Sequence, residues 1–203
     1  GMAQVDAHVT ILEEDDVRCR MRQRDDFAHK GTMGHALIIA GSRGMAGAAM
    51  LATKACLRSG VGKVTVHTPA ANIIPLQIGV PEAILDIDPD NCFFTEAVST
   101  DRFQAMGIGP GLGNNENSAI TMIGQLRRAQ CPIVIDADAI NILATHKAWM
   151  QQLPAGCILT PHIGEFERLE GASSDSYDRL SKAIILADRQ QAYIVLKGHN
   201  TAI

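Results

Sequence analysis

The sequence predicts an α/β protein in which a mostly parallel β-sheet is covered by helices on both faces. Short apolar runs of strand length alternate with stretches in which apolar residues recur at helical spacing. Glycine and polar residues follow the apolar runs, where tight strand-to-helix turns are expected. The chain contains no fixed-period repeat and no low-complexity linker, so this alternation indicates a sheet built from βα units.

Residues 29–68 contain the clearest βαβ unit. Residues 36–40 are an apolar run that predicts a buried strand, and residues 41–44 interrupt it with glycines. One helix face is then expected at positions i, i+3, i+4 and i+7, formed by Ala48, Leu51, Ala52 and Ala55. Ser59-Gly60 predicts the helix end, because glycine adopts the left-handed conformation at low cost. Residues 63–67 predict the second strand.

The first 28 residues carry many charges and predict a solvated arm. Within it, Asp15, Asp16 and Val17 predict the start of a short helix that runs into residues 18–22. Residues 72–89 hold three prolines, which predicts irregular structure with one short strand near residues 83–86.

Strands and helices continue to alternate in the second half of the chain. Strands are expected at residues 103–108, 133–135, 157–159 and 193–196. One helix is predicted by the apolar spacing of Ala119, Met122, Ile123 and Leu126, and a short one ends at Leu143. A further helix, capped by Ser173 or Ser174, would bear Tyr177, Leu180, Ile184 and Ala187. Residues 201–203 resemble the opening of another strand, so we expect the natural sequence to continue.

Composition narrows the class of protein. The 203 residues favour one domain, and 46% hydrophobic residues can bury a sizeable core. A net charge of −4 does not indicate the basic surface that a nucleic-acid-binding protein needs. No apolar run approaches the ~20 residues of a membrane span. Five widely spaced cysteines without a CxxC pair indicate reduced, buried thiols in a cytoplasmic protein. The N-terminus is unlike a secretory signal, and Gly1 before Met2 is typical of a removed purification tag.

Four predicted strand ends carry glycine or polar residues, namely residues 41–44, 109–113, 136–141 and 160–165. In a parallel sheet they would gather at one edge, where open α/β sheets bind ligands. A single such turn needs no explanation beyond a tight connection, whereas four together favour a site. The small residues Gly47, Ala48 and Ala49 would let a bulky ligand approach the backbone. We therefore expect Ala48, His162 and the 109–113 loop to share one cleft.

Individual side chains at this edge each allow two interpretations. Asp136 and Asp138 are two apart on an extended segment, so they would point to opposite faces. One of them would bind a ligand or cap the next helix, and Asn141 lies just beyond. His162 is either structural or catalytic, and Glu165 could simply complement a helix dipole.

Phosphate-binding and metal-binding signals are sparse. The glycines within residues 107–113 are spaced by two, which does not match the G-x-G-x-x-G motif. The G-x-x-x-x-G-K-[ST] motif is also absent from the sequence. The backbone N–H groups of that loop could still hold a pyrophosphate or an alcohol. Lys197 suits a phosphate contact or is a solvated lysine, and His29-Lys30-Gly31 is a solvent loop or a basic rim. The seven histidines lack metal-ligand spacing, so no transition metal is expected.

Several short motifs share their order and spacing with one known family. They are His29-Lys30-Gly31, Ile39-Ala40-Gly41-Ser42, Gly47-Ala48-Ala49, Arg58-Ser59-Gly60-Val61-Gly62, Gly109-Pro110-Gly111-Leu112-Gly113, Asp136-Ala137-Asp138-Ala139-Ile140-Asn141, Thr160-Pro161-His162-Ile163-Gly164-Glu165 and Leu196-Lys197-Gly198. From about residue 18 to residue 203, the chain resembles the ADP- or ATP-dependent NAD(P)H-hydrate dehydratases of the ribokinase-like superfamily.

This resemblance implies a ribokinase-like three-layer α/β/α sandwich and a repair reaction. NADH or NADPH hydrated at the nicotinamide ring would be phosphorylated on the added hydroxyl by ADP or ATP with Mg²⁺, and phosphate would then leave. Phosphate is a far better leaving group than hydroxide. By the same resemblance, the hydrated cofactor would contact Ala48, Ala49, Gly109, Gly111, Gly113, Asp138, Asn141 and His162. The nucleotide would contact Lys197, Gly198, His199, Asn200 and Thr201.

The resemblance also sets expectations for the whole chain. The family's Gly-rich segment with its catalytic Asp is expected beyond Ile203, so the 203 residues should bind a dinucleotide better than a sugar and turn over little. Residues 1–28 would form an arm and residues 29–203 a domain that lacks its C-terminal part. A homo-oligomer and a fused N-terminal epimerase domain are further expectations. The alternatives are a kinase of a small alcohol or vitamin precursor, and a nucleotide-binding or oligomerisation module without catalysis.

Overall fold

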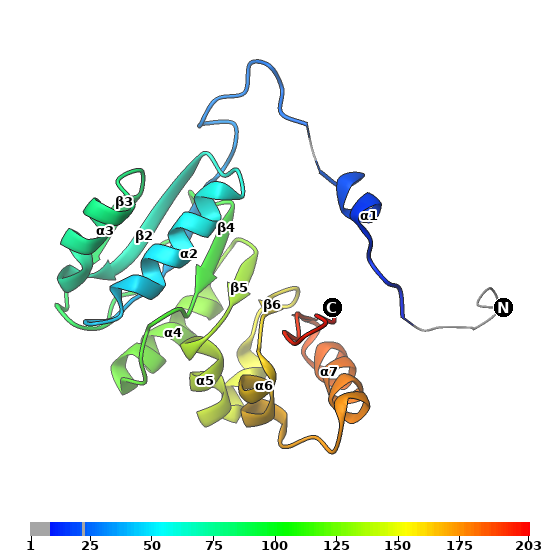
Figure 1. Ribbon diagram of the computed structural model, residues 1–203. Helices are drawn as coiled ribbons and strands as arrows, with labels where there is room; N and C mark the ends of the chain where they lie inside the picture. The colour runs from blue at the N-terminus through cyan, green and yellow to red at the C-terminus, as the bar shows by residue number, and fades with distance from the viewer. Residues whose placement is uncertain (1–8, 22) are drawn as a thin grey trace.

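A single parallel sheet organises the molecule. The computed structural model describes residues 9–21 and 23–203 and shows a seven-stranded sheet of order β3-β2-β1-β4-β5-β6-β7 (Figure 1). Every pairing between neighbouring strands is parallel, which confirms the predicted fold class. The strands are β1 (His35–Ile39), β2 (Lys63–Pro69), β3 (Ile84–Asp88), β4 (Ala105–Ile108), β5 (Ile133–Ile135), β6 (Ile158–Leu159) and β7 (Tyr193–Ile194).

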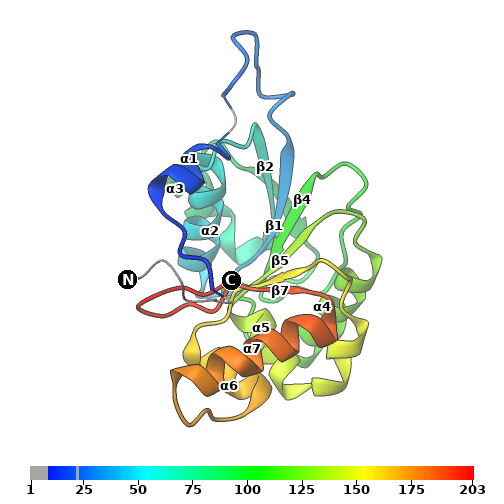
Figure 2. The same ribbon diagram turned by 90° about the vertical axis from the view of Figure 1, so that its right-hand side faces the viewer.

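Helices cover the sheet on both faces and give three layers (Figure 2). They are α2 (Ala46–Arg58), α3 (Ile73–Gly79), α4 (Glu116–Arg128), α5 (Asp138–Thr145), α6 (Ile163–Glu170) and α7 (Ser176–Gln190), with 3₁₀ turns η1 (Ala70–Asn72) and η2 (Lys147–Gln152). The remaining helix, α1 (Glu14–Arg18), lies on the N-terminal arm away from the sheet (Figure 1). The α2 and α3 helices pack together on one face, and α4 to α7 contribute to the core on the other.

Strand β1 separates two hydrophobic cores. Leu37 and Ile39 belong to the larger core, which β4 to β7 share with α4 to α7. Ile38 belongs to the smaller core formed with β2, α2 and α3. Because successive side chains of a strand point to opposite faces, this one strand serves both layers.

Most predicted elements are present within a few residues of their expected bounds. The expected apolar face of α4 is confirmed, since Ala119, Met122, Ile123 and Leu126 are all buried. The helix end at Ser59-Gly60 is also confirmed, because α2 ends at Arg58 and Gly60 has φ +103°. The final stretch pairs back on the chain, since Ala202 forms an antiparallel bridge with Leu196.

Two predicted helix faces are wrong. In α2 the buried residues are Ala49 and Thr53, whereas Leu51 is 72% exposed, because the helix packs between the sheet and α3 on the next stripe. In α7 Tyr177 and Ile184 are exposed and the buried residues are Ala183 and Leu186. Three of the four expected α7 residues, Leu180, Ile184 and Ala187, instead line an apolar groove beside β7 together with Tyr193 and Ala202.

Two local predictions are also corrected. Residues 72–89 are not irregular at their start, since α3 forms there with Pro75 in its first turn, where its missing N–H costs little. Helix α7 is capped by Asp175, whose side chain accepts from the Asp178 N–H, and neither Ser173 nor Ser174 caps it.

The arm and the cysteines complete the comparison. The helix predicted near Asp15 exists as α1 but ends at Arg18, while Gly1, Met2 and Arg22 lie outside the described residues. All five cysteines are free, yet only Cys157 is buried, where burial raises the pKa of its thiol to about 11. Within residues 9–21 and 23–203, no helix is both long and apolar enough to span a membrane.

Candidate functional site

The candidate site lies where the strand order reverses. Strand β1 pairs with both β2 and β4, so the connections run outward in opposite directions from the β1–β4 pair. The loops after these strands meet, because the Gly41 N–H donates to the Pro110 carbonyl at 2.8 Å. A crevice at such a switch point is where open α/β sheets bind ligands.

Glycine is required in the loop after β4. A Cβ on Gly109 would lie 1.8 Å from the Asp136 carbonyl oxygen, and its φ is +131°. A Cβ on Gly111, whose φ is +68°, would lie 2.9 Å from the Cβ of Ala48. The loop therefore packs against the start of α2 and the end of β5, which places Ala48 beside it as expected. Ala49 is fully buried in the smaller core and supports the turn from beneath.

Asp138 holds the far end of this loop. Its Oδ2 accepts the Gly113 N–H at 2.9 Å, and its Oδ1 lies 3.4 Å from the amide nitrogen of Asn141. The Asn141 oxygen in turn accepts from Arg168 on α6 at 2.9 Å. Asp138 and Asn141 thus join one polar chain that runs from the glycine loop to α6.

Asp136 faces a different partner. Its Oδ1 accepts from Lys197 Nζ at 2.8 Å, which ties the end of β5 to the segment after β7. Burial alone would raise the pKa of Asp136, but hydrogen bonds from Lys197 and Thr160 outweigh burial and hold this pKa below its usual range. Neither carboxylate caps α5, because its N-cap is Ala137 without a side-chain hydrogen bond. Ala137 has φ +51°, a strained value for a residue with a Cβ.

His162 caps helix α6 and remains half exposed. Its Nδ1 accepts the N–H groups of Gly164 and Glu165 at 3.0 and 3.3 Å, and Glu165 accepts the His162 N–H at 2.9 Å. This reciprocal pair is a capping box with histidine in the usual Ser or Thr position. The His162 side chain is 54% exposed, and its Nε2 lies 3.3 Å from the Oε1 of Glu165.

The segment after β7 lies beside His162. The Lys197 N–H donates to the Pro161 carbonyl at 2.8 Å, and Lys197 bridges His162 in parallel register. Lys197, Gly198, His199 and Asn200 line a cavity of about 410 Å³ together with Tyr177 and other α7 residues. Thr201 is exposed next to this cavity. The predicted substrate residue His162 and the predicted nucleotide residue Lys197 therefore lie side by side, and Asp136, which was assigned to neither set, pairs with Lys197.

Comparison with known proteins identifies the family. The family model described as NAD(P)H-hydrate dehydratase matches residues 36–203, which is most of the chain. The chain belongs to the NAD(P)H-hydrate dehydratase family. The resemblance seen in the sequence motifs is thereby confirmed.

Individual relatives agree with this assignment. The chain is 37% identical over 199 residues to the ADP-dependent (S)-NAD(P)H-hydrate dehydratase of Bacillus subtilis, covering 97% of this chain and 69% of that protein. The Staphylococcus aureus enzyme of the same name is 38% identical, covering 89% of this chain and 64% of its own length. A bifunctional NAD(P)H-hydrate repair enzyme of Thermosynechococcus vestitus is 36% identical, and the match spans 36% of its length.

Solved structures confirm the ribokinase-like fold. The B. subtilis ADP/ATP-dependent NAD(P)H-hydrate dehydratase, co-crystallised with ATP and Mg²⁺, superposes with a TM-score of 0.79 at 34% identity, covering 93% of this chain and 66% of that one. A ribokinase-like superfamily protein from Enterococcus faecalis gives a TM-score of 0.73 at 24% identity, with 94% and 66% covered. The chain therefore spans about two thirds of its single-domain relatives.

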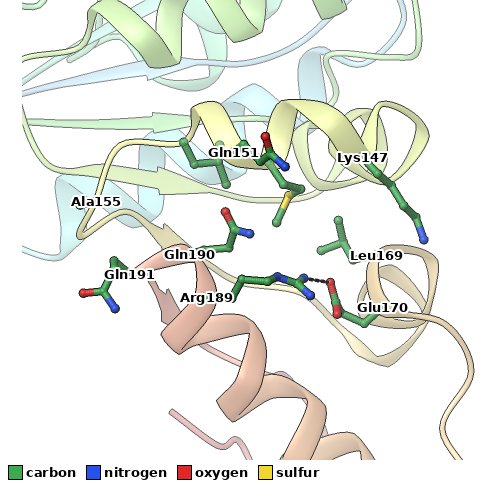
Figure 3. Close-up of a pocket in the computed structure, with 10 residues that line it drawn as sticks. Lys147, Gln151, Ala155, Leu169, Glu170, Arg189, Gln190 and Gln191 are labelled. Atoms are coloured by element: carbon green, nitrogen blue, oxygen red, sulfur yellow. Dashed lines mark hydrogen bonds and ion pairs between the residues drawn. The ribbon is translucent and has the colours of Figure 1, made fainter.

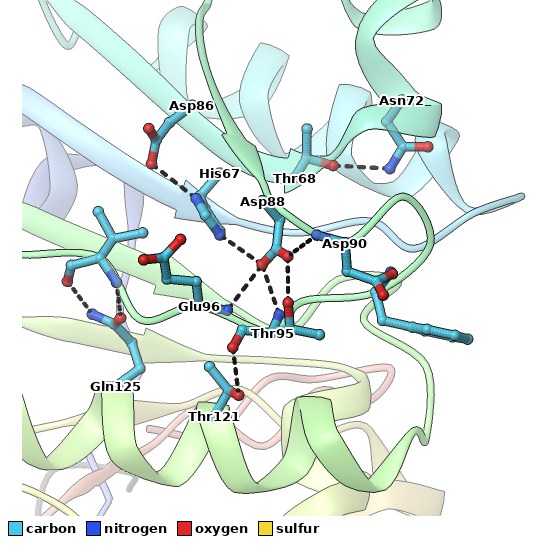
Figure 4. Close-up of polar contacts among 12 residues, drawn as sticks. His67, Thr68, Asn72, Asp86, Asp88, Asp90, Thr95, Glu96, Thr121 and Gln125 are labelled. Carbon is cyan, nitrogen blue, oxygen red and sulfur yellow. Dashed lines mark hydrogen bonds and ion pairs between the residues drawn. The ribbon is translucent and has the colours of Figure 1, made fainter.

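A buried polar network near the family's glycine turn was not predicted. His67 on β2 contacts Asp86 and Asp88 on β3, with ring nitrogen to carboxylate distances of 2.8 and 3.1 Å (Figure 4). The alternation of Asp86, Ile87 and Asp88 was the available signal, because it places both carboxylates on one face of the strand. Pairing of β2 with β3, which the sequence did not reveal, brings His67 opposite Asp86.

A second large hollow lies at the opposite edge of the sheet. A cavity of about 870 Å³ is lined by residues preceding β6 and β7, and by Glu170 and Arg189, whose side chains pair at 2.6 Å (Figure 3). None of the predicted site residues lines it. Because ligands of such sheets bind at the carboxyl ends of the strands, we do not include this hollow in the candidate site.

Proposed function

We propose that the protein containing these residues returns hydrated NADH or NADPH to NAD(P)H in an ADP- or ATP-dependent reaction. The observation that carries the proposal is the junction of the two half-sites. The Asp138-held glycine loop and the Asp136–Lys197 pair lie at the same edge of the sheet, in a chain of the NAD(P)H-hydrate dehydratase family. Relatives named for this reaction match nearly the whole chain.

Each half-site would have its own task. Ala48, Gly109, Gly111 and Gly113 would accept the dinucleotide close to the backbone, on the support of Ala49, while Asp138, Asn141 and His162 would contact its polar groups. The segment Lys197, Gly198, His199, Asn200 and Thr201 would hold the nucleotide. The ammonium of Lys197 already lies at the end of β5, so it would be positioned to offset phosphate charge there.

Mg²⁺ would be held mainly by the phosphates. Among the described residues, no group of three or more His, Cys, Asp or Glu side chains is placed to hold a metal ion. This suits Mg²⁺, which usually takes one or two carboxylates together with phosphate oxygens and water. Asp136 and Asp138 are the carboxylates at this edge that would contribute. When bound, the ion would neutralise charge on the phosphate being transferred.

The wider organisation follows the same proposal. Residues 1–28 would act as an arm and residues 29–203 as part of the dehydratase domain, in a cytoplasmic homo-oligomer. A fused epimerase domain is proposed from the extra length of the bifunctional relatives.

Binding tests the substrate assignment directly. Calorimetry on the 203-residue chain should detect NADPH hydrate and show much weaker binding of ribose. The Asp138→Asn variant should bind the hydrate about tenfold more weakly, because a neutral oxygen holds the Gly113 amide less well than a carboxylate does. Asp101→Asn on an exposed loop is the matched control and should bind like the parent chain. Equal binding of ribose and hydrate would contradict the proposal.

Turnover tests the reaction. The longest natural chain that includes these residues should form NADPH from the hydrate when given ADP or ATP with Mg²⁺, and should release inorganic phosphate. A retained phosphorylated product would indicate the kinase alternative. Binding with no product of either kind would indicate a module without catalysis.

A further inference from the structure

The carboxylate of Asp88 is a buried hub at the end of β3. Its side chain is fully buried, and five donors reach its two oxygens (Figure 4). The donors are His67 Nε2 at 3.1 Å, the Asp90 N–H at 2.9 Å, the Thr95 N–H and hydroxyl at 2.6 Å each, and the Glu96 N–H at 3.1 Å. An ionised carboxylate is the only side chain able to accept this many bonds at once.

These contacts fix the loop of residues 89–96. Asp90 completes its tip by accepting the N–H groups of Cys92 and Phe93 at 2.7 and 2.9 Å. Phe94 is buried in the larger core, and the Thr95 carbonyl accepts from the hydroxyl of Thr121 on α4 at 3.2 Å. The loop has no regular secondary structure, so these side-chain bonds replace the ladder that a strand or helix would supply.

The loop in turn supports the glycine turn after β1. The Arg43 N–H donates to the Cys92 carbonyl at 2.8 Å, in the middle of residues 41–44. The same loop also accepts the Ala71 N–H at the Asn91 carbonyl, 3.3 Å away. The glycine turn is thus held from one side by the 89–96 loop and from the other by Pro110 of the glycine loop.

We propose that Asp88 is a positioning residue for the glycine turn of residues 41–44, and through it for the neighbouring substrate loop of residues 109–113. By fixing the 89–96 loop it holds the backbone of Arg43, and thereby sets the separation between residues 41–44 and the 109–113 loop. His67 supports this role by contacting Asp88 from β2. The proposal rests on the proposed function, because the 109–113 loop, which residues 41–44 contact through Pro110, is given a substrate role only by that reaction.

The test separates positioning from general stability. In the longest natural chain, Asp88→Asn should raise KM for NADPH hydrate about tenfold, change kcat by less than about threefold, and leave KM for the nucleotide within about twofold. Asp90→Ala removes only the loop tip and should give a smaller rise of the same kind. Asp101→Asn is the control, since Asp101 is exposed and its side chain contacts Ser99 but no residue of the 89–96 loop in the described hydrogen bonds, and its KM values should match the parent enzyme.

Amide hydrogen exchange gives a second readout that does not need activity. Exchange at the Arg43 N–H should accelerate in Asp88→Asn and Asp90→Ala, and should stay slow in Asp101→Asn. Parallel rises in both KM values, or unchanged Arg43 exchange in the loop variants, would overturn the proposal. If Asp88→Asn does not fold, Asp90→Ala decides. If the parent enzyme shows no hydrate repair, the proposed function fails, while Arg43 exchange still decides whether Asp88 holds the turn.

Discussion

Gly109 is the position at which an added methyl group would most disrupt the packing of the site. Its backbone passes so close to Asp136 that a Cβ would stand 1.8 Å from the carbonyl oxygen, and its φ of +131° disfavours any other residue. Gly109→Ala should therefore lower the free energy of unfolding by about 2–5 kcal/mol, as the sum of backbone strain and overpacking. Chemical denaturation monitored by circular dichroism measures this loss.

Gly124 provides the matched control. It lies inside α4, and a Cβ there would meet nothing within 4 Å. Gly124→Ala should raise the free energy of unfolding by about 0.5–1 kcal/mol, because alanine loses less backbone entropy in a helix. A Gly109→Ala variant as stable as Gly124→Ala would show that the loop can relax away from Asp136.

His162 shows why residue roles are hard to read from sequence. Its position between turn formers at a strand end was informative, and it does lie at the predicted edge. The same ring also accepts two backbone N–H groups as a helix cap. The structural interpretation is therefore confirmed for this side chain, while its contact with the substrate stays a prediction.

At the scale of single elements, the start of α7 tests a corrected prediction. The Asp175 side chain accepts the Asp178 N–H at 2.8 Å, so it satisfies one of the free donors of the first turn. Asp175→Ala should lower the free energy of unfolding by about 1 kcal/mol, the usual cost of losing an N-cap. Ser173→Ala should cost less, because its hydroxyl has no hydrogen-bond partner among the described residues. A larger loss of stability in Ser173→Ala than in Asp175→Ala would indicate that the serine caps the helix instead.

Elements with a strong period were predictable and those without it were not. The spacing in α4 matched its buried face because that helix packs on one side only. Helix α3 was missed because apolar residues occupy nearly every position and Pro75 interrupts them, so neither period nor propensity indicated a helix. The buried face of α2 was mispredicted because alanines occur on two adjacent stripes of the helix. Packing against α3 determines which of these stripes is buried, and the sequence alone does not show this.

The location of the candidate site, at the carboxyl ends of the strands, was predictable from the sequence, but the contacts among its side chains were not. Turn residues after four strands are visible in sequence, and parallel pairing brings them together. The Asp136–Lys197 pair joins positions 61 residues apart, and the His67–Asp88 contact joins positions 21 apart. Such pairs depend on which strands become neighbours and in what register, which local patterns do not determine.

For the whole molecule, buried carboxylates should set the acid limit of stability. Burial would raise the pKa of Asp88, but hydrogen bonds from Thr95, Asp90 and Glu96 outweigh it and hold this pKa below its ordinary value of 3.8. A carboxyl whose pKa is lowered by folding stabilises the protein fully above the unfolded value, and this contribution is lost as pH falls through the folded value.

The free energy of unfolding should therefore fall as pH drops below about 4, where the unfolded chain takes up more protons. Asp88→Asn should be less stable at neutral pH and should show a shallower fall in acid, since it has no charge there to titrate. Urea unfolding across pH 3–7 measures both slopes (~1 kcal/mol precision is sufficient). An identical acid slope in the variant and the parent chain would contradict the role given to Asp88, and Asp101→Asn serves as the exposed control.

Strand β1 contributes side chains to both hydrophobic cores, and the glycine turn of residues 41–44 follows the end of this strand. A ligand bound to residues 41–44 would thus stabilise both cores against unfolding, because neither core can unfold without moving β1. A ligand gripping only the segment after β7 would restrain the larger core alone. Ligands at these two places would therefore have different effects on unfolding. A ligand on residues 41–44 would make the two cores unfold as one cooperative unit, whereas a ligand on the segment after β7 would increase the difference in stability between the two cores.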